Sequence, residues 1–227
     1  MAEKSKKTKT ELVFILDRSG SMGGLESDTV GGYNAMMEKQ KDVESDITVT
    51  TVLFDDCYEL LHDRVRYEEL SPMTEKDYFV RGGTALIDAI GKTIIKIENA
   101  QRYTAKEHRA NKVIFVITTD GFENSSKEFR AEQVKKMVTQ KREKDKWEFI
   151  FLGANIDAVE TAEHYGFARS RSMNFCADRQ GLEIQYNTIG DTLCCIAECG
   201  ETLSEAEMID YLAPIAEDYE KRKDTNL

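Results

Sequence analysis

Oxygen-bearing side chains gather directly after two apolar runs. Residues 17–21 (Asp-Arg-Ser-Gly-Ser) follow the run at 12–16, and Thr119-Asp120-Gly121 follows the run at 113–118. Between them in the chain, Thr84 comes after a pair of glycines. Carboxylate and hydroxyl oxygens without Cys or His are the ligands that Mg²⁺ prefers. The residues therefore predict a divalent-cation site, with the ligands Asp17, Ser19, Ser21, Thr84 and Asp120.

Short apolar runs alternate along the chain with segments of helical spacing. Such runs are typical of parallel strands buried on both faces. A short edge strand at 57–61 is expected to return as a hairpin, and 63–80 is expected to be irregular with one helical turn. The other predicted strands are 12–16, 47–54, 113–118, 147–152 and 172–175. The predicted helices cover 25–41, the segment from Gly83 to about 103, the region of 134–138, 157–165 and 182–196.

This alternation predicts a doubly wound α/β fold. Crossover helices between parallel strands must cover the sheet, so helices are expected on both faces of a mostly parallel sheet. Ligands of such sheets bind beyond the carboxyl ends of the strands, where the strand order reverses. The segments 17–21, 82–84 and 119–121 are therefore expected to meet at that edge.

Three motifs occur together in a fixed order: DxSxS after the first strand, a threonine after a glycine pair, and TDG after the run at 113–118. In combination they resemble the metal ion-dependent adhesion site of von Willebrand factor A domains. The resemblance covers roughly residues 11–200. It implies a six-stranded sheet in the order 3-2-1-4-5-6 with one antiparallel edge strand. Asp17 and Asp120 would then lie on either side of the switch point.

The resemblance also implies how the site works. Ser19, Ser21 and Thr84 would supply hydroxyl oxygens, and the two aspartates would bind the ion directly or through water. An Asp or Glu carboxylate from another protein would complete the coordination shell, because a charge-assisted contact is strong in a partly dry site. The expected ion is Mg²⁺, with Mn²⁺ or Ca²⁺ as alternatives. The expected function is non-enzymatic, divalent-cation-dependent protein binding.

The same residues also have simpler interpretations. Ser and Thr are preferred at helix N-caps, and the two aspartates are candidates for ion pairs with Arg18 or Arg81. Two carboxylates that converge with three hydroxyls would repel each other without a cation, which favours the metal. Asp88 and Glu123 lie near the motifs in sequence, and both are expected to be exposed and solvated.

Other functions fit the residues less well. A Mg²⁺-dependent phosphohydrolase of the haloacid dehalogenase type needs a second carboxylate two residues after the first, where this chain has Ser19. Gly91-Lys92-Thr93 resembles the end of a P-loop, but that motif requires glycine at Leu86 and a loop rather than a helix. A metal-free structural scaffold remains the alternative to metal-dependent binding.

Composition limits the partners and the location. The chain has 31 Lys plus Arg against 42 Asp plus Glu and a net charge of -11, which disfavours nucleic acid as a partner. No apolar segment approaches the ~18 residues of a membrane span. The first ten residues are mostly polar, unlike a signal peptide, and five cysteines do not form a disulfide framework. A cytoplasmic protein is predicted. Intracellular members of the resembled family suggest an assembly, chaperone-like or stress-response role beside an ATPase.

Three segments are expected along the chain. Residues 1–10 form a flexible basic arm, 11–200 the von Willebrand factor A-type domain, and 201–227 a helical extension. That extension is amphipathic over 203–221, and we expect its apolar side to pack on the domain. Cys194, Cys195 and Cys199 are expected to be buried free thiols of a core helix.

Overall fold

A six-stranded sheet forms the centre of the protein in a computed structural model that describes residues 7–199 and 202–223. The strand order is β3-β2-β1-β4-β5-β6. All neighbouring strands are parallel except β2 and β3, which are antiparallel. The predicted doubly wound fold and its strand order are therefore confirmed. The strands are β1 (Thr8–Asp17), β2 (Ser45–Phe54), β3 (Tyr58–Arg66), β4 (Lys112–Thr119), β5 (Glu148–Gly153) and β6 (Ser172–Asn174).

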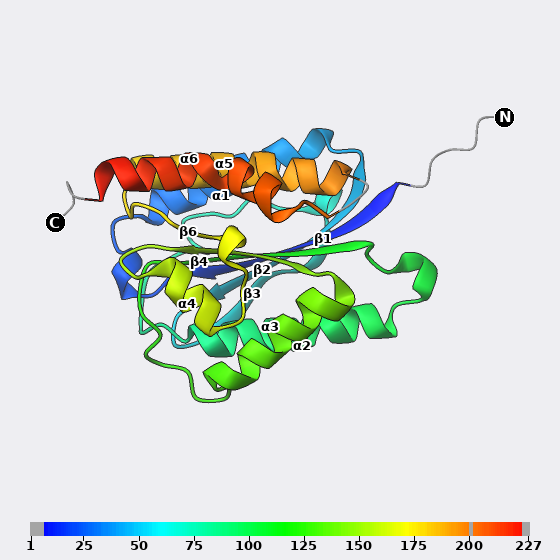
Figure 1. Cartoon of the computed structure of the whole chain (residues 1–227), viewed down its shortest axis with the longest axis horizontal. Coiled ribbons are helices and arrows are strands. Elements are labelled where there is room, and N and C mark those ends of the chain that lie inside the picture. The colour runs from blue at the N-terminus through cyan, green and yellow to red at the C-terminus, as the bar shows by residue number, and fades with distance from the viewer. Residues whose placement is uncertain (1–6, 200–201, 224–227) are drawn as a thin grey trace.

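Helices cover both faces of this sheet (Figure 1). On one face lie α1 (Glu26–Lys39), α5 (Arg179–Glu198) and α6 (Glu205–Arg222). On the other face lie α2 (Leu86–Tyr103), α3 (Ala131–Asp145) and α4 (Ala158–His164). Short 3-10 turns join these elements: η1 (Gly20–Met22), η2 (Gln40–Asp42), η3 (Tyr67–Glu69), η4 (Lys106–His108) and η5 (Arg169–Arg171). None of the described helices combines the length and apolar composition needed to cross a lipid bilayer.

The central strand β1 contributes to two separate hydrophobic cores. Leu12, Phe14 and Leu16 face the core under α1 and α5, whereas Val13 and Ile15 face the core under α2 and α3. All five side chains are essentially inaccessible to solvent. Burial on both faces explains why this strand has a continuous apolar sequence instead of an alternating one.

The edge strand β3 is longer than the predicted strand at 57–61. It continues to Arg66, so the first part of the segment predicted to be irregular is strand. The pairing with β2 contains register shifts, and Arg64 has a φ of 51°. A bulge interrupts the two-residue alternation, and an edge strand has charged residues that keep it from pairing further. Because of the bulge and the charged residues, the sequence of β3 does not alternate regularly, and only part of the strand was predicted.

The predicted helical extension is α6. Ser204 and Glu207 form a capping box at its start, in which the Ser204 hydroxyl accepts the Glu207 N–H at 3.2 Å. Met208, Leu212 and Ile215 are buried in the core shared with α1 and α5. The helix therefore packs on the domain, as expected from its apolar side. Of the predicted basic arm, residues 1–6 lie outside the described residues, and β1 already begins at Thr8.

Candidate metal centre

Three loops meet at the carboxyl edge of β1 and β4. The Gly20 N–H donates to the Gly82 carbonyl at 3.3 Å, which joins the loop after β1 to the glycine pair before α2. Gly121, which follows β4, lies close to side chains of both of these loops. A Cβ on Gly121 would stand 3.2 Å from Ser21 Oγ and 3.6 Å from Thr84 Oγ1. The hydroxyls of two loops therefore converge over the backbone of the third.

Asp17 ends β1 and is almost completely buried. Its Oδ1 accepts the Ser19 N–H at 2.7 Å, and its Oδ2 accepts the Thr119 hydroxyl at 2.6 Å. Burial raises the pKa of Asp17 to about 6, although these hydrogen bonds oppose the shift, and the nearby charge of Asp120 raises it further. The folded protein therefore holds this carboxylate in an environment that disfavours its negative charge.

Asp120 follows β4 and faces the loop after β1. Its Oδ1 accepts the Ser21 hydroxyl at 2.5 Å, and the hydroxyl oxygens of Ser21 and Ser19 are 3.1 Å apart. Its Oδ2 is buried, and no group in the described part of the chain donates a hydrogen bond to it. Burial raises the pKa of Asp120 as well. A buried carboxylate oxygen without a donor is costly, and it points to a missing positive partner.

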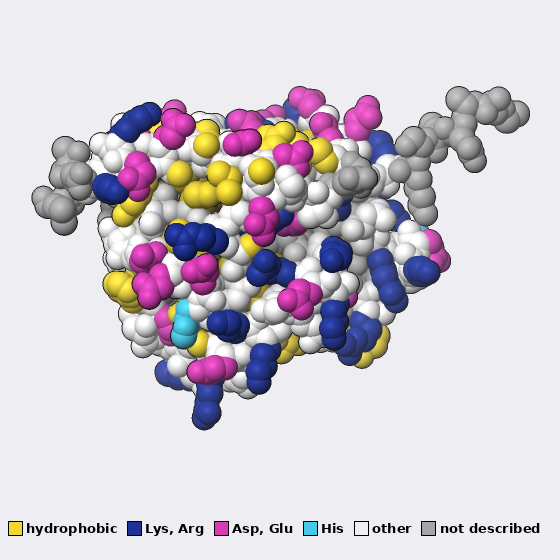
Figure 2. Space-filling view, in the orientation of Figure 1, with side chains coloured by type: hydrophobic (Ala, Val, Ile, Leu, Met, Phe, Trp, Pro, Cys, Tyr) yellow, Lys and Arg dark blue, Asp and Glu magenta, His cyan; other side chains and the backbone are white. Residues whose placement is uncertain are grey.

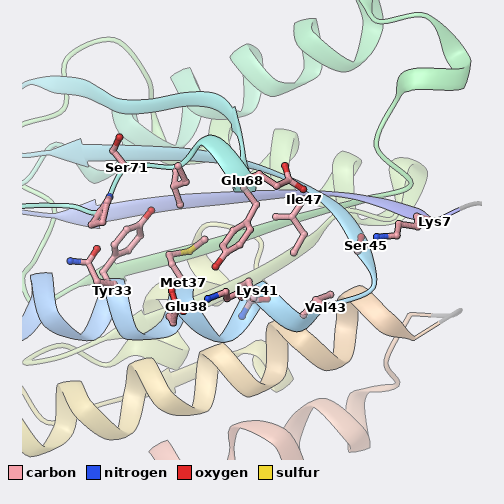
Figure 3. Close-up of a pocket in the computed structure, with 15 residues that line it drawn as sticks. Lys7, Tyr33, Met37, Glu38, Lys41, Val43, Ser45, Ile47, Glu68 and Ser71 are labelled. Atoms are coloured by element: carbon pink, nitrogen blue, oxygen red, sulfur yellow. Dashed lines mark hydrogen bonds and ion pairs between the residues drawn. The ribbon is translucent and has the colours of Figure 1, made fainter.

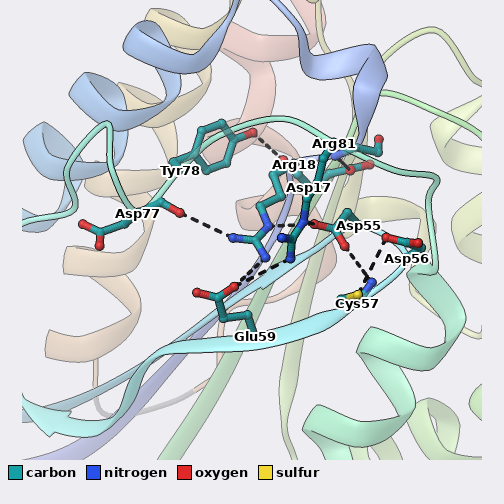
Figure 4. Close-up of polar contacts among 10 residues, drawn as sticks. Asp17, Arg18, Asp55, Asp56, Cys57, Glu59, Asp77, Tyr78 and Arg81 are labelled. Atoms are coloured by element: carbon teal, nitrogen blue, oxygen red, sulfur yellow. Dashed lines mark hydrogen bonds and ion pairs between the residues drawn. The ribbon is translucent and has the colours of Figure 1, made fainter.

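Neither aspartate forms an ion pair with a described Lys or Arg, and the two nearby arginines bind elsewhere (Figure 4). Arg18 Nε lies 2.9 Å and Arg81 Nε 2.7 Å from Asp55 Oδ2. Arg18 also contacts Glu59 at 2.6 Å. We call Arg18, Asp55, Glu59 and Arg81 the arginine cluster. Pairing of the site aspartates with Arg18 or Arg81, one of the simpler interpretations, is therefore wrong.

The arginine cluster braces the loops of the candidate site. The Arg81 N–H donates to the Arg18 carbonyl at 3.0 Å, and the Ala85 N–H donates to the Asp55 carbonyl at 2.8 Å. Both guanidinium groups lie over the Phe79 ring, 5.1 and 5.2 Å from its centroid. No motif in the sequence indicates this cluster, because Asp55 lies 37 positions from Arg18.

The turn after β2 also brings Asp55 close to Asp56 and Cys57. One ligand atom from each lies within 4.8 Å of the others. Asp55, however, is already neutralised by two guanidinium groups. Asp56 and Cys57 are exposed. This group therefore lacks the unsatisfied buried charge that distinguishes Asp120.

The hydroxyls of the site do not cap helices. Helix α2 starts after Ala85 and α1 after Leu25, and neither start has a side-chain cap bond. Ser19 precedes the short turn η1 without capping it. The capping interpretation is thus wrong for Ser19 and Thr84. The hydroxyl of Ser21 binds Asp120 instead.

Asp88 is buried, so the expectation that it is solvated is wrong. Its carboxylate accepts the N–H groups of residues 127–129 at 2.8–3.2 Å. Glu123 is half-buried and accepts the N–H groups of Ile87 and Ser125, each at 2.9 Å. Together they fasten the loop after β4 to the start of α2. The partners of Asp88 are backbone amides, and Glu123 also accepts a serine hydroxyl of the same loop at 2.7 Å. Such contacts leave no signal in the sequence.

A separate hollow of about 490 Å³ lies between α1 and the segment after β3 (Figure 3). Its lining includes Tyr33, Met37, Ile47 and Leu70. It contains none of the five predicted metal ligands. The candidate centre is therefore at the sheet edge and not in this hollow.

The donor set at the sheet edge fits a hard divalent cation. The site contains two buried carboxylates and three hydroxyls, and no described cation is paired with them. These are the oxygen-rich, negatively charged surroundings that Mg²⁺-type ions require. The structure brings the predicted residues into this one region. Contacts link Asp17 to Ser19, Ser19 to Ser21 and Ser21 to Asp120, and Thr84 lies over Gly121. The residues and their placement define an α/β domain with an acidic, hydroxyl-lined centre at its switch point.

Comparison with solved structures shows which proteins share this architecture. No protein-family profile and no curated protein matches the chain. The von Willebrand factor domain of the type V pili tip protein Mfa5 from Porphyromonas gingivalis is similar over 88% of this chain and 99% of its own length, with 11% identity and a TM-score of 0.59. The chain therefore has the fold of a von Willebrand factor A domain.

Two further structures are similar over about half of their own length. Proximal thread matrix protein 1 from the mussel byssus, with a zinc-occupied MIDAS motif, matches over 83% of this chain and 46% of its own, with 14% identity and a TM-score of 0.55. The ArnB paralog VWA2 from Sulfolobus acidocaldarius matches over 82% and 46%, with 14% identity and a TM-score of 0.52. At these identities the likeness concerns the fold alone.

Proposed function

We propose that this protein is a divalent-cation-dependent protein-binding module. The ion is held by five side chains, and an Asp or Glu carboxylate of a partner protein completes its shell. The observation that carries the proposal is the buried Asp120 Oδ2, which no described group donates to, beside a second buried carboxylate whose pKa is raised. The five proposed ligands are Asp17, Ser19, Ser21, Thr84 and Asp120.

A bound ion supplies positive charge that favours both carboxylates and attracts a third from outside. The chain itself orients the site. Thr119 and the Ser19 amide hold Asp17, while Ser21 holds Asp120. Phe122, 68% exposed, follows the Asp120-Gly121 segment and offers the partner an apolar contact. We assign Mg²⁺ as the ion because all five donors are oxygen atoms, with Mn²⁺ and Ca²⁺ as alternatives.

We further propose that the module is not an enzyme. A phosphohydrolase of the type considered above would use a carboxylate where Ser19 stands, and the Ser19 hydroxyl contacts Ser21 instead.

We place the role of the module in the cytoplasm, in assembly, chaperone-like action or stress response beside an ATPase. Capture of partners from a native lysate, with Mg²⁺ and with chelator, tests this part, because the proposed partner is retained only with Mg²⁺.

Calorimetric titration with Mg²⁺, Mn²⁺ and Ca²⁺ tests the metal site. One ion is expected to bind per chain, and at one hundred times its Kd it should stabilise the fold by about 2.7 kcal/mol. Asp17→Asn and Asp120→Asn are expected to abolish binding. Asp56→Asn is the matched control, since Asp56 is an exposed carboxylate at the same edge. Unchanged binding in both site variants would rule out the proposed ligands.

A short peptide with a single aspartate tests the carboxylate step. It should bind the Mg²⁺-loaded protein and not the chelator-treated protein, and the same peptide with asparagine should not bind. Equal binding of the two peptides to the metal-loaded protein would show that the site holds an ion without capturing carboxylates.

A further inference from the structure

Two thiols face each other at the end of α5. Cys195 Sγ and Cys199 Sγ are 3.4 Å apart, and the Cys195 thiol donates to the Tyr211 hydroxyl oxygen of α6 at 2.8 Å. Both cysteines and the neighbouring Cys194 are half-buried, so the expectation that these three thiols are buried is wrong. Figure 2 shows hydrophobic side chains at the surface over α5 and α6, where Ile209 and Tyr211 are partly exposed.

The other described thiols do not share this arrangement. Cys194 directs its thiol to the Lys39 carbonyl at 3.5 Å. Cys176 is buried, and Cys57 is exposed at the turn between β2 and β3. Cys195 and Cys199 are therefore the described pair whose sulfur atoms are in contact.

The local backbone allows a bond between these two sulfur atoms. A disulfide requires a sulfur–sulfur distance near 2.05 Å, so the atoms must approach by about 1.4 Å. Four residues apart inside a helix, two cysteines are held too far apart for good disulfide geometry. Cys199, however, is the C-cap of α5, with extended φ and ψ of -61° and 136°. The Cys199 N–H still donates to the Cys195 carbonyl at 2.8 Å, and Lys112 contacts the Cys199 carbonyl. Because α5 ends at Glu198, the backbone at Cys199 can shift at the cost of these end contacts while the rest of the helix keeps its hydrogen bonds.

We propose that Cys195 and Cys199 form a reversible disulfide when a peroxide-class oxidant is present. One thiol, as its thiolate, attacks a peroxide oxygen and becomes a sulfenic acid, and the peroxide's other oxygen leaves as water. The second thiol then displaces the sulfenic oxygen as a second water. Two thiols and one hydrogen peroxide thus give one disulfide and two waters, and an added dithiol reverses the change.

Formation of this disulfide removes the thiol proton that Cys195 donates to Tyr211. The disulfide would therefore change the contact between α6 and the C-terminal end of α5. This inference concerns the thiols alone and is independent of the metal centre.

Mass spectrometry of the full chain treated with hydrogen peroxide tests the proposal. The intact mass is expected to fall by two hydrogens, and dithiothreitol is expected to restore it. Glu198 lies between the two cysteines, so cleavage after glutamate separates them into two peptides. These peptides should stay joined in the oxidised protein and separate after reduction.

Single serine variants decide which thiols react. Cys195→Ser and Cys199→Ser should each reduce the joined peptide to less than a tenth of its yield in the unmodified chain. Cys194→Ser is the matched control and should leave the yield unchanged. A thermal melt confirms that each variant is folded. Joined peptides that persist in Cys195→Ser, or oxidation that stops at sulfinic acids with no link, would overturn the proposal.

Discussion

Buried carboxylates have different partners, and pKa values shifted in opposite directions, in two neighbouring regions of this molecule. In the arginine cluster, Asp55 is inaccessible to solvent and receives two guanidinium groups. Burial alone would raise its pKa, but the hydrogen bond from Arg81, the Cys57 amide and the charge of Arg18 together lower it. In the candidate metal centre, Asp17 and Asp120 have only neutral donors, and burial raises both pKa values.

Two further buried carboxylates have a cationic partner like that of Asp55, whereas the buried Asp88 is stabilised by the N–H groups of residues 127–129. Glu148 is paired with Arg171 at 2.5 Å, and the buried Glu11 with Arg64 at 2.7 Å. Buried ions are tolerated when a partner of opposite charge is present. In the candidate centre, Asp120 Oδ2 has neither a cationic partner nor a described N–H donor, although two arginines are close by. This difference supports the proposal that the positive partner of the centre is a bound cation.

Removal of the Asp55 carboxylate is expected to have the largest effect. Asp55→Asn leaves the fully buried Arg18 without its buried counter-charge, which should cost about 3–5 kcal/mol of unfolding free energy. Urea denaturation in chelator measures the loss. A cost near zero would mean that the arginine cluster does not hold Arg18 in place.

Asp17 should make a contribution to the stability of the metal-free protein that falls as pH rises. Because the pKa of Asp17 is raised to about 6, the folded state binds more protons than the unfolded state between pH ~4 and ~6. The contribution of Asp17 to stability should therefore fall as pH rises through this window, by on the order of 2–3 kcal/mol. Denaturation of the unmodified chain and of Asp17→Asn at several pH values in chelator isolates this contribution as the difference between the two slopes, because Asp120, whose pKa is also raised, titrates in both proteins.

Asp120→Asn should separate folding from metal binding. The amide keeps the shape of the side chain but removes a buried charge that lacks a partner, so the metal-free protein should gain about 1 kcal/mol. The same variant should lose the stabilisation by Mg²⁺. A variant that is destabilised without metal would show that Asp120 already has a favourable partner in the fold.

Glu59→Gln should have the smallest effect. Glu59 contacts Arg18 at 2.6 Å, but its side chain is 49% exposed, and water screens the pair. We expect a loss of about 0.5 kcal/mol, measured beside Asp55→Asn in the same denaturation series. A loss as large as that of Asp55→Asn would show that Glu59 is as important a counter-charge for Arg18 as Asp55.

The sequence predicted the fold well where strands are buried on both faces. The runs at 12–16 and 113–118 have no alternation because both sides of each strand pack on helices. Because the carboxyl ends of parallel strands meet at one edge of the sheet, the motifs that follow these runs were predicted to lie close together. The structure brings these loops together, while the role of the five residues as metal ligands stays a prediction.

The rest depended on contacts that sequence patterns do not record. Arg18 and Asp55 are 37 positions apart, and Asp88 binds the amides of residues 127–129. Neither pairing produces periodicity or a motif. The extent of β3 was missed for a related reason, because its bulged and charged sequence does not alternate.

The two outer strands of the sheet limit how this molecule can join others. One border, β3, is irregular and carries charged side chains, and the other, β6, is only three residues long. Neither offers a long flat row of free amides and carbonyls for an incoming strand. Extension of the sheet from one molecule to the next is therefore disfavoured, and association is left to side chains on loops and helices.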